Sequence, residues 1–462
     1  MNATVQMMSQ VTFSEGPSLS FQANYLSKFS KAPVKRRLAG RKVLDGVGQP
    51  TLEVEIYCTV KNCEKSFCII LQRICSAIIS SHYQIHENAL SETTEADEKE
   101  RNDSVTTAVE WVNESLNTML RDLKPTDQCD IDKMLGEYFS KKVEENKEIQ
   151  KEEEEGTLSL TSCAPSAVAR SRQKKEAKTG KKSHTERTIP PAEPNASVLC
   201  GSSAIGGTSL AVAKAGASIN HIPLYLHIAL LKRSQSQQPS PHLADSKKGR
   251  AQKKEKKASV KGKYEILTGT FRSADEMVDV YVELVNKFPS VIAIVDPLRK
   301  EDREQWNNMC CALGSKCYLI AEDAATNISK LQTNINNIPT CSGVVLKYVN
   351  QTKVSDLIEL TGLLDGQRHV TVLGSPDGES PDDSLVDLTG LKHALSRFKA
   401  AGLGARFIKL GGLSRGERAT KYNRLLAIEE ELAKNRTLRM SFFLTLFSAR
   451  NEYGNKDWRE ND

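Results

Sequence analysis

The stretch that decides the fold is residues 291–347, where VIAIV (291–295), CYLIA (317–321) and GVVLK (343–347) begin 26 residues apart. HVTVL (369–373) follows at the same interval, and RFIKL (406–410) ends the series. Continuous apolar runs predict strands buried on both faces, and the helical patterns between them predict crossover helices. Because no glycine-rich loop follows the first run, a βα barrel is favoured over a nucleotide-binding sheet.

The rest of the chain carries weaker patterns of both kinds. QPTLEVEIY (49–57) alternates apolar and polar residues and predicts a half-buried strand, whereas the apolar run 67–79 fits a strand or a buried helix. Ser273 and Glu276 form a capping-box pattern that opens a helix over 273–288. Further helices are expected from a cap at Asp103 or Ser104 to 120, over 126–143, from about 202 and from about 223.

Composition divides the chain into alternating structured and low-complexity segments. The expected order is a weakly ordered amino terminus (1–40), an α+β domain (41–143), a disordered linker (144–195), helices that open the barrel (196–231), a basic linker (232–262), the βα barrel domain (263–437) and a tail (438–462). The fold class predicted is therefore α/β, with an incomplete TIM-like barrel, an α+β amino-terminal domain and disordered insertions.

The net charge is only +6, but it is unevenly spread. Residues 170–187 and 247–263 are basic, and 144–155 are acidic. The two basic stretches contain no aromatic residue, whereas single-stranded nucleic acid is normally bound with aromatic stacking platforms. We therefore favour solvated linkers over nucleic-acid or anionic-membrane binding for these segments.

The number and spacing of the cysteines and the length of the apolar segments indicate the cellular compartment. Eleven cysteines are present, an odd number, and no CxxC pair occurs, which favours a reducing environment. The first residues lack the basic start and apolar run of a signal peptide, and the apolar run 67–79 is too short to span a bilayer. We expect a cytoplasmic protein without a membrane partner, or a component of an intracellular assembly.

Several segments resemble the enolase family, the phosphopyruvate hydratases. They are RKVLDGVGQPTLEVE (41–55), AIGGTSLAVAKAGASINHIPLYLHI (204–228), VIAIVDP (291–297), LKYVNQ (346–351) and RGERATKYNRLLAIEEEL (415–432), the last being the most specific. The low-complexity insert resembles that of a divergent enolase-like branch associated with sperm flagella. The resemblance implies an enolase-type barrel and an enolase-type dimer or other homo-oligomer.

The resemblance also implies roles for individual residues. Lys347 matches the family's proton acceptor, and Lys409 matches a lysine that contacts the substrate. Glu322 matches one carboxylate ligand of Mg²⁺, which prefers hard oxygen ligands, and Asp296 and Asp323 are weaker candidates beside it. Lys347 and Lys409 end predicted strands, which is where a barrel places its chemistry.

Other positions depart from the family's pattern. Val295 stands where a second carboxylate ligand is expected, and 45–48 (DGVG) lacks the expected serine. Ser375-Pro376-Asp377 replaces a His-Arg-Ser segment that grips phosphate. Only five barrel strands are recognisable, whereas closure needs about eight. Either 264–271 (YEILTGTF) and the amino-terminal part help to close the edge, or the chain is a shortened product; we favour the second.

The retained and the altered positions lead to two alternative functions. One is a Mg²⁺-dependent lyase of glycolysis that converts 2-phosphoglycerate to phosphoenolpyruvate and water. The alternative is a non-catalytic enolase-like subunit of an assembly with cytoskeletal or flagellar proteins, such as that of the sperm flagellum, needed for motility. Because groups that act as a unit lose nearly all activity when some are removed, we favour the alternative.

Overall fold

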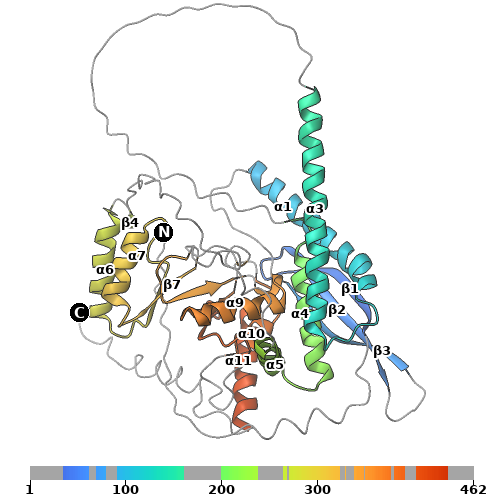
Figure 1. The fold of residues 1–462 in the computed structure, drawn as a ribbon. Coiled ribbons are helices and arrows are strands. Elements are labelled where there is room, and N and C mark those ends of the chain that lie inside the picture. The colour runs from blue at the N-terminus through green and yellow to red at the C-terminus, as the bar shows by residue number, and fades with distance from the viewer. Residues whose placement is uncertain are drawn as a thin grey trace, which may run out of the picture.

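The computed structural model describes residues 35–61, 69–79, 91–160, 199–237, 264–267, 270–322, 328, 338–347, 349–375, 379–390 and 402–434. Figure 1 shows an antiparallel sheet with long helices at one end of the molecule and the barrel strands with their helices beside it. No described helix is long and apolar enough to cross a membrane. Most of the two segments predicted to be disordered linkers, and all of the predicted tail, lie outside the described residues.

The amino-terminal sheet has three antiparallel strands in the order β1-β2-β3. They are β1 (Lys35–Leu44), β2 (Pro50–Lys61) and β3 (Ile69–Ile78). Within the apolar run at 67–79, residues 69–78 therefore form a strand and not a buried helix. β1 begins at Lys35, inside the range expected to be weakly ordered, because its backbone pairs with β2 from Lys35 to Leu44. A strand held by cross-strand hydrogen bonds does not require a strong apolar pattern of its own.

The helices of the amino-terminal half are longer than their apolar patterns indicated. α1 (Ser91–Trp111) starts twelve residues before the expected cap at Asp103 and continues as a π-helix, η2 (Val112–Leu116), and α2 (Asn117–Met119). α3 (Gln128–Leu160) runs into the predicted linker, and its carboxyl-terminal half projects beyond the body of the protein in Figure 1. The extra turns are rich in Glu and Lys, which favour helix without an apolar face.

α4 (Ser203–Ile219) is the buried helix that joins the two halves of the protein, and α5 (Leu224–Gln237) follows it. Leu52, Val54 and Ile56 of β2 are buried in the same core cluster as α4. On its other side α4 meets the barrel so closely that a Cβ at Gly206 would lie 2.0 Å from the carbonyl carbon of Gln351. α5 extends six residues past Leu231, into the predicted basic linker.

The second half contains a parallel sheet of five strands in the order β10-β9-β8-β7-β6. The strands are β6 (Ala293–Val295), β7 (Tyr318–Ala321), β8 (Gly343–Leu346), β9 (Val370–Gly374) and β10 (Phe407–Lys409). Their helices are α6 (Ala274–Lys287), α7 (Arg303–Leu313), the 3₁₀ turn η4 (Val349–Gln351), α9 (Val354–Gly366), α10 (Ser384–Thr389) and α11 (Gly416–Lys434). Each of the five predicted strands is present, and α6 has the predicted capping box of Ser273 and Glu276. This α/β architecture confirms the predicted fold class.

The segment 264–271 does not extend this sheet. β4 (Tyr264–Leu267) and β5 (Thr270–Arg272) pair with each other in a separate antiparallel hairpin. The amino-terminal strands likewise form their own sheet. Among the described residues the parallel sheet therefore has five strands, fewer than the eight of a complete barrel of this kind.

The two faces of the parallel sheet bury different side chains. One face, with Leu319, Val344 and Leu373, belongs to the same core cluster as residues of α6, α7 and α9. The opposite face forms its own cluster, made of Ala293, Ile320, Val345, Val372 and Phe407. Because side chains alternate along a strand, the residue two positions further along each strand continues the same face.

Candidate functional site

The candidate site lies at the carboxyl edge of the parallel sheet. Two positions beyond Ile320, Val345 and Phe407 stand Glu322, Lys347 and Lys409, so these three side chains continue the sheet face that forms the second cluster. Parallel strands end at a common edge, and the structure brings all three predicted residues together there. The sequence alone placed Lys347 and Lys409 at strand ends, and the structure adds that they share one partner.

Glu322 bridges the two lysines. Its Oε1 lies 2.9 Å from Nζ of Lys347, and Nζ of Lys409 donates a hydrogen bond of 2.6 Å to its Oε2. Lys347 follows β8, the neighbour of β7, but Lys409 ends β10, three strands away. In a flat sheet, strands three spacings apart lie about 14 Å from each other. The contact therefore depends on the curl of the sheet and on the length of the lysine side chain.

Electrostatics keep this carboxylate ionised. The Glu322 side chain is 7% exposed, whereas those of Lys347 and Lys409 are 28% and 27% exposed. Burial by itself would raise the pKa of Glu322, but the charges and hydrogen bonds of the two lysines outweigh it and hold that pKa below its ordinary value. The cluster thus combines one internal anion with two partly accessible cations.

The other proposed metal ligands that the structure describes do not complete a cage. Asp296 adopts a left-handed backbone with φ +47°, and its Oδ1 accepts a hydrogen bond of 2.8 Å from the Glu322 backbone N–H. Val295, which ends β6, has no donor atom. Asp323 lies outside the described residues. Nowhere in the described ranges are three Asp, Glu, His or Cys side chains grouped to hold a metal ion.

Magnesium, which the resemblance implies, requires several oxygen ligands in near-octahedral geometry. Both oxygens of Glu322 already face lysine cations, and the position of the second expected ligand is a valine. A cation placed there would also meet two like charges at close range. The described residues at this edge therefore do not fit the ion.

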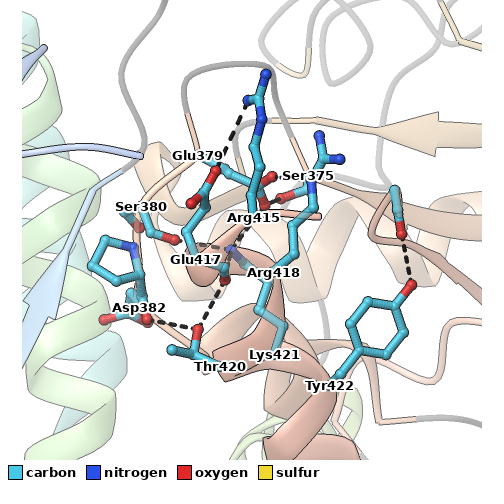
Figure 2. Close-up of polar contacts among 12 residues, drawn as sticks. Ser375, Glu379, Ser380, Asp382, Arg415, Glu417, Arg418, Thr420, Lys421 and Tyr422 are labelled. Carbon is cyan, nitrogen blue, oxygen red and sulfur yellow. Dashed lines mark hydrogen bonds and ion pairs between the residues drawn. The ribbon is translucent and has the colours of Figure 1, made fainter. Parts of the chain in front are cut away.

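A second polar cluster lies beyond β9, where the phosphate-gripping segment was expected. Figure 2 shows Ser375, Arg418 and Lys421 pointing toward the carboxylate of Glu379. Arg418 Nε donates to Oε1 at 2.6 Å, and Lys421 Nζ and Ser375 Oγ donate to Oε2 at 2.9 and 2.6 Å. Burial alone would raise the pKa of Glu379, but these three donors lower it. Ser375 thus binds an internal carboxylate, while Pro376 and Asp377 lie outside the described residues.

The segment 379–384 also holds the two halves of the protein together. The Glu379 carbonyl accepts from the N–H of Gly46 at 2.8 Å, so the turn at 45–48 contacts this segment. Asp382 Oδ2 accepts from Lys214 Nζ of α4 at 2.8 Å and from the N–H of Ile78 at 3.0 Å. Sequence reasoning missed this network. Its signal was the charged pattern of 415–421, but nothing in that pattern shows which charges become buried.

Comparisons with known proteins agree with this architecture. Residues 247–442 match the family described as "Enolase, C-terminal TIM barrel domain". A human protein named Enolase 4 is 40% identical, with 90% of this chain and 83% of the relative covered. Proteins of the same name from Xenopus laevis and Danio rerio are 37% and 28% identical, covering 92% and 89% of this chain and 88% and 85% of the relatives.

The alignment with the human relative spans 539 positions, 77 more than the 462 residues of this chain, so that relative contains segments that this chain lacks. On the barrel match and on identity sustained over nine tenths of its length, the chain belongs to the enolase family.

Proposed function

We propose that this chain is a non-catalytic enolase-like protein that works by binding, as a subunit of an intracellular assembly. The observation that supports this proposal is the engagement of both Glu322 oxygens by Lys347 and Lys409. Dehydration of 2-phosphoglycerate passes through a doubly charged enolate, and divalent metal supplies the charge that stabilises such a species. Among the described residues at this edge, the carboxylates of Glu322 and Asp296 offset the charges of the two lysines, and no group of metal ligands adds positive charge to stabilise that enolate.

The second candidate is phosphopyruvate hydratase activity. It is favoured by the position of Lys347 and Lys409, which stand at strand ends on the face where an active site of this fold would lie. A lysine base alone, however, supplies only part of a unit whose members act together, and removal of the rest normally abolishes nearly all catalysis. The two candidate functions therefore predict different rates of 2-phosphoglycerate turnover.

The deciding experiment is a turnover assay on the purified full chain. 2-Phosphoglycerate and Mg²⁺ are added, and phosphoenolpyruvate is followed by its ultraviolet absorbance, with Lys347→Ala as the matched variant. We expect the same background rate for both proteins. Turnover by the natural chain that disappears in Lys347→Ala would overturn the proposal and establish the lyase.

The binding role has its own test. Members of the enolase family are typically dimers, and we propose that this chain also self-associates and joins cytoskeletal or flagellar proteins. Light scattering coupled to size-exclusion chromatography should give twice the mass of one chain, and antibody labelling of sperm should mark the flagellum. A monomer at micromolar concentration, or label spread evenly through the cytoplasm, would contradict the respective part.

A further inference from the structure

We infer that the π-helical turn η2 and the residue that follows it protect the outer edge of the amino-terminal sheet. The side chains of Asn113 and Asn117 occupy backbone groups of β1 with which the β1 strand of a second copy of this chain would otherwise pair. Among the described strands β1 lies at one edge of the sheet, since the order is β1-β2-β3. An edge strand presents a row of backbone N–H and C=O groups, which is a template for pairing with another chain.

The backbone groups of β1 point alternately toward β2 and away from it. β1 pairs with β2 in an antiparallel register from Lys35 to Leu44, and in such a pair every second residue directs its N–H and C=O outward. Leu38 and Gly40 are two of these residues, because their N–H groups donate to side chains outside the sheet. The outward groups of these two residues are therefore ones that an added strand would use.

Two asparagine side chains satisfy these outward groups. Asn113 Oδ1 accepts from the Gly40 N–H at 2.9 Å, and Asn113 Nδ2 donates to the Gly40 carbonyl at 2.9 Å, so one amide makes the two bonds that a neighbouring strand would make. Asn117 Oδ1 accepts from the Leu38 N–H at 2.7 Å. The asparagines stand four residues apart, on one side of the helical segment, and alternate residues of a strand lie about 7 Å apart. One helical segment thus covers both positions.

A glycine in β1 allows the helical turn to approach this closely. Val112 and Leu116 are fully buried and hold η2 against the core. A Cβ at Gly40 would lie 2.9 Å from the Cβ of Val112, so a larger residue there would push the turn away from the strand. Asn113 is nevertheless exposed, so the edge at Gly40 borders on solvent. At this position the amide of Asn113 is therefore the group that a second chain would have to displace.

Charge is a second obstacle to pairing at this edge. Five of the ten residues of β1 are Lys or Arg, and like charges on paired strands repel each other. The β1 strand of a second copy carries the same charges, so the two strands meet only when this repulsion is screened. The consequence of removing the asparagines should therefore be measured in about 0.5 M NaCl, where surface charges interact over only a few ångströms.

The first experiment measures hydrogen exchange at single backbone amides of the full chain. Asn113→Ala is compared with Asn102→Ala, which replaces another exposed asparagine, on α1. We expect the Gly40 amide to exchange about tenfold faster in Asn113→Ala than in the control, the change expected for the loss of one hydrogen bond. The Leu38 amide, which donates to Asn117, should be the same in both variants. Equal exchange at Gly40 in the two variants would overturn the inference.

The second experiment tests the protection of the edge. In about 0.5 M NaCl, the mass of Asn113→Ala/Asn117→Ala by light scattering should be at least about twofold that of the natural chain, as expected when two copies pair edge to edge. In the associated form the Leu38 and Gly40 amides should exchange slowly again, because a neighbouring strand has replaced the asparagines. A mass equal to that of the natural chain, or association that leaves these two amides in fast exchange, would refute the protective role.

Discussion

The contact between α4 and the barrel can be tested by adding one methyl group. Gly206 lies inside α4, and a Cβ built there would be 2.0 Å from the carbonyl carbon of Gln351 and 2.2 Å from its oxygen. Both atoms are backbone, so they cannot yield by a change of rotamer. The 3₁₀ turn that contains Gln351 comes shortly after Lys347, which directly follows β8. Gly206→Ala therefore pushes on the segment that supports the candidate site.

The magnitude follows from two opposing effects. Alanine gains about 0.5–1 kcal/mol over glycine inside a helix, and overpacking of a well-packed core costs roughly 1–3 kcal/mol, occasionally more. Because the clash is with backbone, we take the upper end and expect a net loss of about 2 kcal/mol. Gly362 in α9 is the matched control, since nothing lies within 4 Å of a Cβ there. Gly362→Ala should stabilise by about 0.5–1 kcal/mol.

The assay is urea unfolding followed by circular dichroism, with the midpoint compared at unchanged slope. The two variants should move in opposite directions and differ by about 3 kcal/mol, which follows from the magnitudes above. Equal shifts, or Gly206→Ala within about 0.5 kcal/mol of the natural chain, would show that α4 and the 3₁₀ turn are not in tight contact.

Two further predictions concern buried ionisable groups. Lys421→Met removes one of the two cations beside the buried Glu379 carboxylate, while Arg418 remains, and should cost about 1.5–3 kcal/mol in urea unfolding. Lys434→Met, at a side chain 78% exposed, should stay near the natural value, and equal effects would refute the importance of burial. Burial lowers the pKa of His227 from 6.5 to about 4, so the unfolded chain takes up a proton first as pH falls. The free energy of unfolding should therefore drop by up to about 3 kcal/mol between pH 6.5 and about 4. His227→Gln should remove this pH dependence. A natural chain that gains stability as the pH falls over this interval would contradict the lowered pKa of His227.

Apolar pattern predicted the strands well because burial on both faces leaves a continuous run in the sequence. All five barrel strands and the cap at Ser273 follow from such local signals. The start of α1 and the end of α3 were missed, since their polar turns carry helix propensity without an apolar face. The start of β1 was missed as well, because its first residues are fixed by pairing with β2 and not by an apolar pattern.

For the candidate site, too, the sequence predicted some features and only the structure showed the others. Sequence named Glu322, Lys347, Lys409 and Asp296, but as separate members of a presumed metal and substrate site. It gave no sign that Glu322 would form ion pairs with both lysines, or that Glu379 would be enclosed by Arg418 and Lys421. Ion-pair partners carry no local signature, because any strand-end charge can face solvent, a metal or another side chain.

By itself, the sequence determined the succession of the five parallel strands, the family and the identity of the charged residues at strand ends. Only the tertiary structure decided which charges meet. Lys409 and Glu322 are 87 residues apart and end strands that are not neighbours, yet they lie 2.6 Å from each other. Local pattern fixes how each segment buries its apolar face, whereas the curl of the assembled sheet fixes the distances across its edge, and those distances separate a metal site from an internal ion bridge.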